Sequence, residues 1–196
     1  NDCLLKKHSE INNYIRSVCF CSNDINIVKS EPSYRRTWID KVVSQLEPVY
    51  VELIHRFNRL LKQRSHFWRS ESFQKDKSSE VIESFDIQMS LISTRIFRRR
   101  RRAVSKIRPY VEYWHNHLSK SKEQIGINYL SGVENINQEE EEEEVISMKI
   151  VEQLQKQRSI EALTGKCSLG PHRDDIEFLI NNISIRTVSY THLTLP

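Results

Sequence analysis

The stretch that most constrains this fold runs from Glu80 to about Lys122, which contains no glycine and a single proline, Pro109. Apolar residues recur along it every three or four positions, the spacing that gathers side chains on one face of an α-helix. The series is Val81, Phe85, Met89, Ile92, Ile96, Val104, Ile107, Val111, Trp114 and Leu118. Because this apolar stripe is narrow, it suits packing against one other helix. We therefore expect a long helix within an antiparallel helical arm.

A second helical region is expected to begin at residues 30–33, where Ser-Glu-Pro-Ser combines capping side chains with a proline suited to a first turn. Pro48 should divide this region at about Glu47, because proline disfavours a helical residue before it. The apolar stripe continues through both halves and comprises Trp38, Ile39, Val42, Val43, Leu46, Val49, Leu53, Ile54, Phe57, Leu60 and Leu61.

Strand signals are fewer. Tyr14–Cys21 is rich in β-branched and aromatic residues and predicts a buried strand, and Ile125–Val133 predicts another. Residues 176–185 form two alternating runs joined by Asn181-Asn182, which predicts a hairpin. A helix is expected over Val145–Leu163. The fold class is therefore α/β in the broad sense (α+β), dominated by helices.

Composition narrows the classes of function. The 196 residues carry a net charge of +4, with 29% charged and 38% hydrophobic residues. No stretch approaches 18 consecutive apolar residues, so neither membrane insertion nor secretion is expected. The four cysteines (Cys3, Cys19, Cys21 and Cys167) show no zinc-binding spacing and are expected to be reduced thiols of a cytoplasmic protein. The chain opens on Asn rather than Met, which indicates a fragment.

Five consecutive arginines interrupt the long helix: Arg98, Arg99, Arg100, Arg101 and Arg102. At 100° per residue they surround the helix, so they cannot all face a core. One interpretation is contact with a phosphate backbone, which requires charge and no sequence code. The other is a solvated stretch offset by the acidic run Glu139–Glu144. The sequence leaves both open.

Arg35 and Arg36 fall in the first turn of a predicted helix, where the helix dipole favours acidic residues. An anion held nearby would explain why two arginines stand at this position. The alternative is that both arginines are simply solvated. Glu112 and His115 could share a helix face, but two candidate ligands do not define a metal site. No metal site is predicted.

The densest group of ionisable residues stands at the entrance to the last apolar strand. It consists of Gly170, Pro171, His172, Arg173, Asp174 and Asp175. Gly-Pro enforces a turn, and the four ionisable side chains follow it directly. Such a group is typical of a working edge of an α/β domain.

These residues resemble the RecF family of bacterial DNA replication and repair ATPases, which are related to SMC-type ABC proteins. Residues 23–40 resemble the family's internal signature, including its Arg-Arg pair at Arg35 and Arg36. Residues 170–175 match its Gly-Pro-His-Arg-Asp-Asp in full, and the resemblance covers about residues 15–187. Departures include Ser30 in place of a glycine and Trp38 in place of Phe or Tyr. No Gly-x-x-x-x-Gly-Lys-Ser/Thr occurs in the sequence.

The resemblance implies a partial ABC-type ATPase head with a helical second lobe of long antiparallel helices. Residues 1–30 and 165–187 would belong to the head, and residues 31–164 to the lobe with its acidic loop. Residues 188–196 match nothing in the family and are expected to be a non-native tail.

The resemblance also implies a function. The complete protein would bind ATP and Mg²⁺, form an ATP-dependent homodimer, and bind single-stranded and double-stranded DNA. It would act with recombination mediators of the RecR and RecO type in replication, recombinational gap repair and the SOS response. Without the Walker A, signature and Walker B motifs, the fragment itself is expected to be inactive as an ATPase. The alternative is a non-enzymatic SMC-like arm that binds nucleic acid or a partner protein.

Roles follow the same resemblance. Arg35 and Arg36 are candidates for phosphate contact, on DNA or across a dimer. Residues 172–175 are expected near the nucleotide face, where an Asp could orient an Arg that meets phosphate. Their alternative role is a structural ion-pair network.

Overall fold

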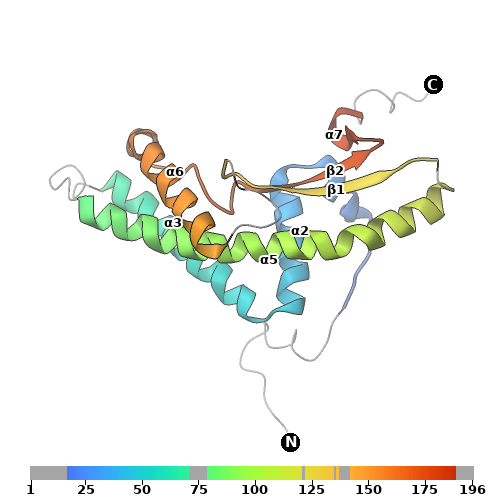
Figure 1. Ribbon diagram of the computed structural model, residues 1–196, viewed down its shortest axis with the longest axis horizontal. Coiled ribbons are helices and arrows are strands. Elements are labelled where there is room, and N and C mark those ends of the chain that lie inside the picture. Colours follow the sequence, from blue (N-terminus) through green and yellow to red (C-terminus); the bar gives the residue numbers. More distant parts are fainter. Residues whose placement is uncertain (1–16, 71–78, 121, 135, 137–141, 189–196) are drawn as a thin grey trace, which may run out of the picture. The chain divides into compact units, whose positions relative to one another are not determined.

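A computed structural model describes residues 17–70, 79–120, 122–134, 136 and 142–188 (Figure 1). The chain divides into two compact units, which are described separately. Unit 1 comprises the chain up to Pro48, Arg99–Leu130, and the chain from Asp174 onward. Unit 2 comprises Val49–Arg98 and Ser131–Arg173.

Unit 1 combines a small sheet with short helices and half of a long one. Its sheet holds β1 (Ile125–Leu130), β2 (Asp175–Ile180) and β3 (Ile183–Ser184), in the order β1-β2-β3 with both pairs antiparallel. The register sets Ile127 opposite Phe178 and Tyr129 opposite Ile176. The helical part comprises a 3-10 turn (Ser22–Ile25), α1 (Asn26–Lys29), α2 (Pro32–Leu46), α7 (Ile185–Val188) and the second half of α5 (Ser79–Ser119).

The core of unit 1 lies where α2 packs against β2. Ile39 and Val43 from the helix are buried, as are Ile127 and Ile176 from the sheet. Each such side chain contributes about 1.5–3 kcal/mol by leaving water. The predicted hairpin is confirmed, because Asn181 and Asn182 both take positive φ angles, 49° and 64°, as a two-residue turn of this hand requires.

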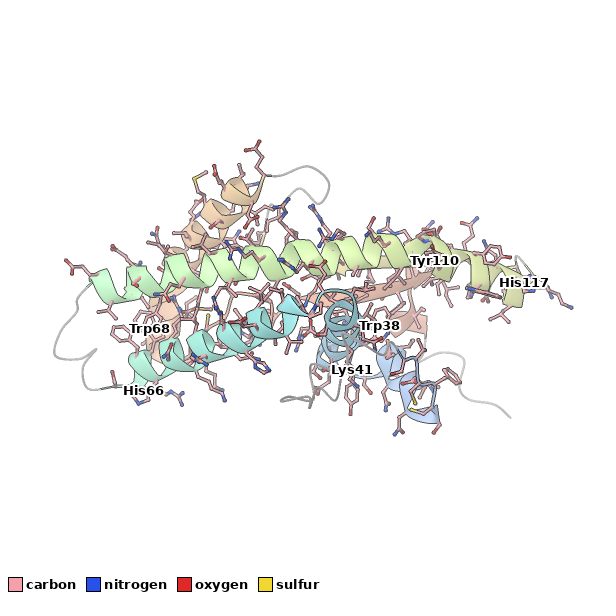
Figure 2. The ribbon with its side chains drawn as sticks, turned by 90° about the horizontal axis from the view of Figure 1, so that it is seen from below. Trp38, Lys41, His66, Trp68, Tyr110 and His117 are labelled. Carbon is pink, nitrogen blue, oxygen red and sulfur yellow. The ribbon has the colours of Figure 1, made fainter. Side chains whose placement is uncertain are left out.

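Unit 2 is helical. It contains α3 (Val49–Arg69), the first half of α5 and α6 (Glu143–Thr164). α3 runs antiparallel beside this half of α5 (Figures 1 and 2). Phe67 of α3 meets Phe85 of α5 with ring centroids 6.1 Å apart. The buried apolar side chains include Leu53, Phe57, Leu60, Trp68, Ile82, Met89, Ile96, Ile146, Ile150 and Leu154. The helix-dominated fold with long antiparallel helices is thus confirmed.

The expected division at Pro48 is also confirmed, since α2 ends at Leu46 and α3 begins at Val49. The predicted strand Tyr14–Cys21 is wrong over its described part. Residues 17–21 form no strand, and Val18 and Phe20 are 98% and 92% exposed. A strand exists only with a hydrogen-bonded neighbour, and the described residues offer this segment none, whatever its β-propensity.

The strand expected over Ile125–Val133 ends earlier, at Leu130. Trp114 and Leu118, expected in the packed stripe of the long helix, are 58% and 79% exposed. Periodicity identifies the apolar face of a helix but not how far a packing partner extends along it. Residues 189–196 of the expected tail, residues 1–16 and residues 139–141 of the acidic run lie outside the described part. Among described residues, no helix is both long enough and apolar enough to cross a membrane.

Candidate functional site

The two sequence motifs meet in unit 1 through Arg35 and Asp175. Arg35 Nε donates to Asp175 Oδ1 at 2.7 Å and Nη2 donates to Oδ2 at 3.3 Å, which makes a two-point ion pair. Arg35 Nη1 donates to the carbonyls of Ile27 and Ser30, at 3.2 and 2.8 Å. Only 1% of the Arg35 side chain is exposed. All three guanidinium nitrogens are therefore used within the fold, and Arg35 fixes the start of α2 against the start of β2.

The neighbouring arginine is placed differently. Arg36 is half-buried, and its Nη1 donates to the backbone carbonyl of Asp174 at 2.9 Å. Burial, and then the charge of Arg100, lowers the pKa of Arg36, although nearby carboxylates oppose the shift. The described residues supply no other acceptor for its remaining N–H groups. Arg36 therefore keeps donors available for an anion, which Arg35 does not.

Arg100 and Asp174 form the second centre of unit 1. Arg100 Nε and Nη2 donate to the two carboxylate oxygens of Asp40, at 2.8 and 2.9 Å, and Nη1 lies 3.4 Å from Asp174 Oδ2. The Tyr129 hydroxyl donates a short hydrogen bond to Asp174 Oδ2. Burial, together with Asp174, raises the pKa of Tyr129 well above its usual value. Arg100 and Asp174 are each about 3% exposed, so this centre is an internal ion-pair network. We call this centre, together with the Arg35–Asp175 ion pair, the head network.

Asp175 also holds the end of the hairpin. Arg186, in α7, donates from Nη2 to Asp175 Oδ2 at 2.7 Å. The Asp175 carboxylate therefore joins a buried arginine of α2 to an arginine that is 50% exposed. Its Oδ1 additionally accepts the backbone N–H of Ile176 at 2.8 Å. These contacts tie α2, β2 and α7 into one assembly.

The arginine run is divided between the units. In unit 2, Arg98 Nη1 donates to Glu143 Oε2 at 2.8 Å. In unit 1, Arg99 and Arg102 both pair with Glu47, Arg100 is buried, and Arg101 is half-buried. Burial would raise the pKa of Glu47, but hydrogen bonds from Arg102 and Arg99 outweigh it and lower that pKa. Carboxylates thus offset much of the run, and the side chains of Arg98 and Arg102 remain 44% and 55% exposed.

The first four residues of the 170–175 motif belong to unit 2. Gly170 has φ 129°, and a Cβ there would lie 3.2 Å from Phe57 Cζ, so only glycine fits. The His172 ring lies against Phe57 with centroids 5.7 Å apart, and its Nε2 lies 3.1 Å from the Cys167 carbonyl oxygen. Pro171 is buried and the Arg173 side chain is exposed. The Arg173 N–H closes the turn on the Gly170 carbonyl at 2.8 Å.

Unit 2 contains a charged cluster that the sequence reasoning missed. Arg64 Nε donates to Glu161 Oε2 at 2.8 Å, and Nη1 makes a short bond to Asp86 Oδ1. Arg158 Nη2 lies 2.6 Å from Asp86 Oδ2, and Trp68 Nε1 donates to Glu161 Oε2 at 3.1 Å. Arg64 and Glu161 are fully buried. We call these residues the lobe network. The only available signal was charge at positions inside an otherwise apolar helical pattern.

ATP and Mg²⁺ are held by oxygen-bearing side chains that coordinate the metal and by a phosphate-binding loop. The described residues include no group of three or more His, Cys, Asp or Glu side chains placed to hold a metal ion. The sequence has no phosphate-binding loop of the Gly-x-x-x-x-Gly-Lys-Ser/Thr type. The acids of the 170–175 motif are committed to Arg35, Arg100, Tyr129 and Arg186. These side chains do not fit a resident metal–nucleotide site by themselves.

Comparison with known proteins gives a consistent match. The chain is 40% identical over 186 residues to the DNA replication and repair protein RecF of Synechococcus sp. (strain CC9605), covering 95% of the chain and 50% of that protein. It is also 40% identical over 173 residues to RecF of Parasynechococcus marenigrum (strain WH8102), covering 88% of the chain and 47% of that protein. The chain therefore spans about half the length of the curated relatives it matches. No family model matches the sequence.

Solved structures agree. The fold superposes with a TM-score of 0.86 on a structure of the recombination mediator protein RecF-ATPrS in the RecFOR pathway, at 27% identity. That match covers 94% of this chain and 48% of the solved one. A structure of RecF-ATP from the same pathway superposes with a TM-score of 0.79 at 26% identity, covering 86% of this chain and 44% of the solved one.

Proposed function

Because this chain is part of a RecF-family protein and spans about half the length of its curated relatives, we propose that it serves ATP-dependent DNA binding in replication and recombinational repair. In this proposal unit 1 contributes to an ATPase head, and unit 2 forms a helical lobe. ATP and Mg²⁺ would be held with residues outside this chain, and the complete protein would form an ATP-dependent homodimer. Recombination mediators of the RecO and RecR type would be its protein partners, and the cytoplasm its location.

The observation that carries the proposal is the convergence of the two motifs on the head network. Arg35 pairs with Asp175, and Arg36 reaches the Asp174 carbonyl, although 140 and 138 residues separate them in sequence. Motif residues so far apart that meet in one buried network are expected where a head surface must be held rigid. We assign Arg35, Arg100, Asp174 and Asp175 to positioning, and Arg36 to phosphate contact.

The exposed arginines of the run are the second DNA candidates. Exposed ion pairs such as Arg102–Glu47 and Arg98–Glu143 are worth about 0–1 kcal/mol, so a phosphate can compete with the carboxylate. Each phosphate neutralised releases counterions and steepens the dependence of binding on salt. Arg100 is excluded from this role, because it is buried and committed to two aspartates.

A salt titration of DNA binding tests the proposal. The double variant R98Q/R102Q should reduce the slope of log K against log salt by roughly 1–2 units, with similar losses for any DNA sequence. The matched control is Arg56→Gln, since Arg56 is also an exposed arginine in an ion pair, with Glu52, and should leave the slope unchanged. Equal slopes for wild type and the double variant would contradict DNA contact by the run.

The effect of ATP on DNA binding distinguishes this proposal from its alternative, an SMC-like arm that binds nucleic acid or a protein without nucleotide. The 196-residue chain is expected to show no ATP turnover above the buffer rate, because its sequence carries no phosphate-binding loop. In a protein that joins this chain to the remaining half of a relative, DNA binding should strengthen with ATP. DNA binding that is equally strong with and without ATP in that protein would favour the arm.

A further inference from the structure

An exposed aromatic surface lies on the C-terminal part of α5, in unit 1. We call it the aromatic stripe, and it consists of Tyr110, Tyr113, Trp114, His117 and Leu118. The exposed fractions of the tyrosines, the tryptophan and the leucine are 68%, 64%, 58% and 79%. Figure 2 labels Tyr110 and His117 toward this end of the helix. Neither the head network nor the core of unit 1 uses these side chains.

The stripe is one continuous face. Spacings of three, four, seven and eight residues from Tyr110 place all five side chains on the same side of an α-helix. Tyr113 and Trp114 meet edge to face, with centroids 5.3 Å apart and planes at 80°, and Trp114 meets His117 at 6.2 Å and 88°. An edge-to-face partner covers at most one face of a ring, so these two contacts leave Tyr113 and His117 each with a ring face that they do not cover.

The charge around the stripe is positive on balance, because Lys106, Lys120 and Lys122 outnumber Glu112 and Glu123, whose Oε2 lies 3.9 Å from His115 Nε2. Lys106 lies one turn before Tyr110 on the same face, Lys120 follows the last residue of α5, and Lys122 is also exposed. None of the three lysines makes an ion pair among the described residues. Glu112, two residues after Tyr110, falls about 200° around the helix and is half-buried. The lysines at 120 and 122 offset the partial negative charge of a helix C-terminus.

We propose that the aromatic stripe binds single-stranded nucleic acid by stacking unpaired bases on its rings while the lysines contact the phosphates. This inference rests on the proposed function, which supplies DNA as the partner. It places DNA binding on a surface that neither of the two motifs includes. Open aromatic faces with interleaved cations are what sequence-independent single-strand binding requires. At 1.5 Å per residue the stripe is about 12 Å long, enough for roughly three or four stacked bases at 3.4 Å each.

A second copy of the chain fits this surface less well. A two-fold contact would bring the same patch of each copy together, and so would bring lysines of the two copies near one another, such as Lys106 of one copy and Lys120 of the other. A single strand brings flat apolar bases and negative charge together, which complements both features of the stripe.

Tryptophan fluorescence offers a direct test with the 196-residue chain. Trp114 is the exposed tryptophan, since Trp68 is 6% exposed and Trp38 is half-buried. A 12-nucleotide oligothymidine should quench the emission at low salt, with saturation. The probes for comparison are an abasic strand of equal length and a blunt duplex. The double variant Y113A/W114A should bind oligothymidine roughly five- to a hundredfold more weakly, as measured by the fluorescence anisotropy of labelled DNA.

Two further variants serve as controls. Trp114→Phe retains an aromatic face and should keep most of the wild-type affinity for oligothymidine. Tyr34→Ala removes a comparably exposed aromatic side chain from α2 and should leave that affinity unchanged. Far-UV circular dichroism and thermal unfolding check that each variant is folded.

The outcomes separate this inference from the function it rests on. If Y113A/W114A binds oligothymidine as tightly as the wild type, the stacking surface is wrong. The same holds if the wild type binds the abasic strand as tightly as oligothymidine. Neither result would contradict DNA binding itself. A doubling of mass in sedimentation that Y113A/W114A abolishes would assign the stripe to a second copy and overturn the inference. No binding of any DNA by the wild-type chain would overturn the stacking surface. It would not decide the proposed function, whose ATP-dependent binding is measured in the protein that joins this chain to the remaining half of a relative.

Discussion

Arg35 and Asp175 stand 140 residues apart in the chain, yet two hydrogen bonds join their side chains in unit 1. The pair links the first turn of α2 to the first residue of β2. The Arg35 guanidinium also donates hydrogen bonds to two backbone carbonyls that precede α2. An ion pair that organises three segments contributes more by fixing their arrangement than by its Coulomb attraction, because desolvation offsets much of that attraction.

Replacing Arg35 with methionine should destabilise unit 1 by about 3 kcal/mol, because Asp175 and two carbonyls lose their donor in a buried setting. Urea unfolding followed by circular dichroism measures the change. Arg56→Met is the control, since Arg56 forms an exposed pair with Glu52 that is worth less than about 1 kcal/mol. Equal shifts for the two variants would show that the Arg35–Asp175 pair does not organise the fold.

Local rules explain which parts of this fold could be predicted from the sequence. Pro32 and Pro48 set the boundaries of α2 because a proline's effects are confined to its own turn and the residue before it. Asn181-Asn182 likewise determined the hairpin. The strand expected over Tyr14–Cys21 is not formed at residues 17–21, because strand formation depends on a hydrogen-bonded partner that the local sequence does not specify.

The candidate site was predictable only in part. The sequence identified Arg35, Arg36 and the 170–175 motif, but not that Arg35 would be consumed internally while Arg36 kept free donors. That distinction depends on side-chain direction after packing. Asp40 and Tyr129 complete the head network from positions that read as ordinary helix and strand residues. No local pattern marks such partners.

Tyr129 should make the protein sensitive to alkali. Its folded-state pKa is raised by burial and by Asp174, whereas an unfolded tyrosine titrates at about 10. Folding therefore favours the protonated phenol, so this contribution is complete below about pH 10 and is lost as the pH rises above it toward the folded pKa. Free energies of unfolding at pH 8.5, 10 and 11 would show a decline in wild type.

Tyr129→Phe should flatten that alkaline decline, at a cost of about 1–3 kcal/mol at neutral pH because Asp174 loses a buried donor. Tyr34→Phe alters an exposed tyrosine and should keep the wild-type decline, since Tyr129 is intact. Parallel declines in wild type and Tyr129→Phe would assign the alkaline loss to other groups.

The lobe network makes a prediction for unit 2. Arg64→Met leaves the buried carboxylates of Asp86 and Glu161 without their shared cation and should cost about 3–5 kcal/mol. Arg158→Met removes a cation that is 24% exposed and leaves Arg64 on Asp86, so its cost should be clearly smaller. Urea midpoints for the two variants provide the comparison. A larger loss from Arg158→Met would make Arg158, rather than Arg64, the centre of the network.

Cys167 should be an unreactive thiol in the folded protein. Burial, and then Glu161, raises its pKa to about 12, so the thiolate is roughly one part in ten thousand at pH 8, against about a quarter for an ordinary cysteine. Cys19 and Cys21 are exposed. In a C3S/C19S/C21S variant, alkylation by iodoacetamide should be slow in buffer and fast in urea, as followed by mass spectrometry. Rapid labelling of that variant in buffer, with its circular dichroism unchanged, would show that unit 2 opens around Cys167 without global unfolding.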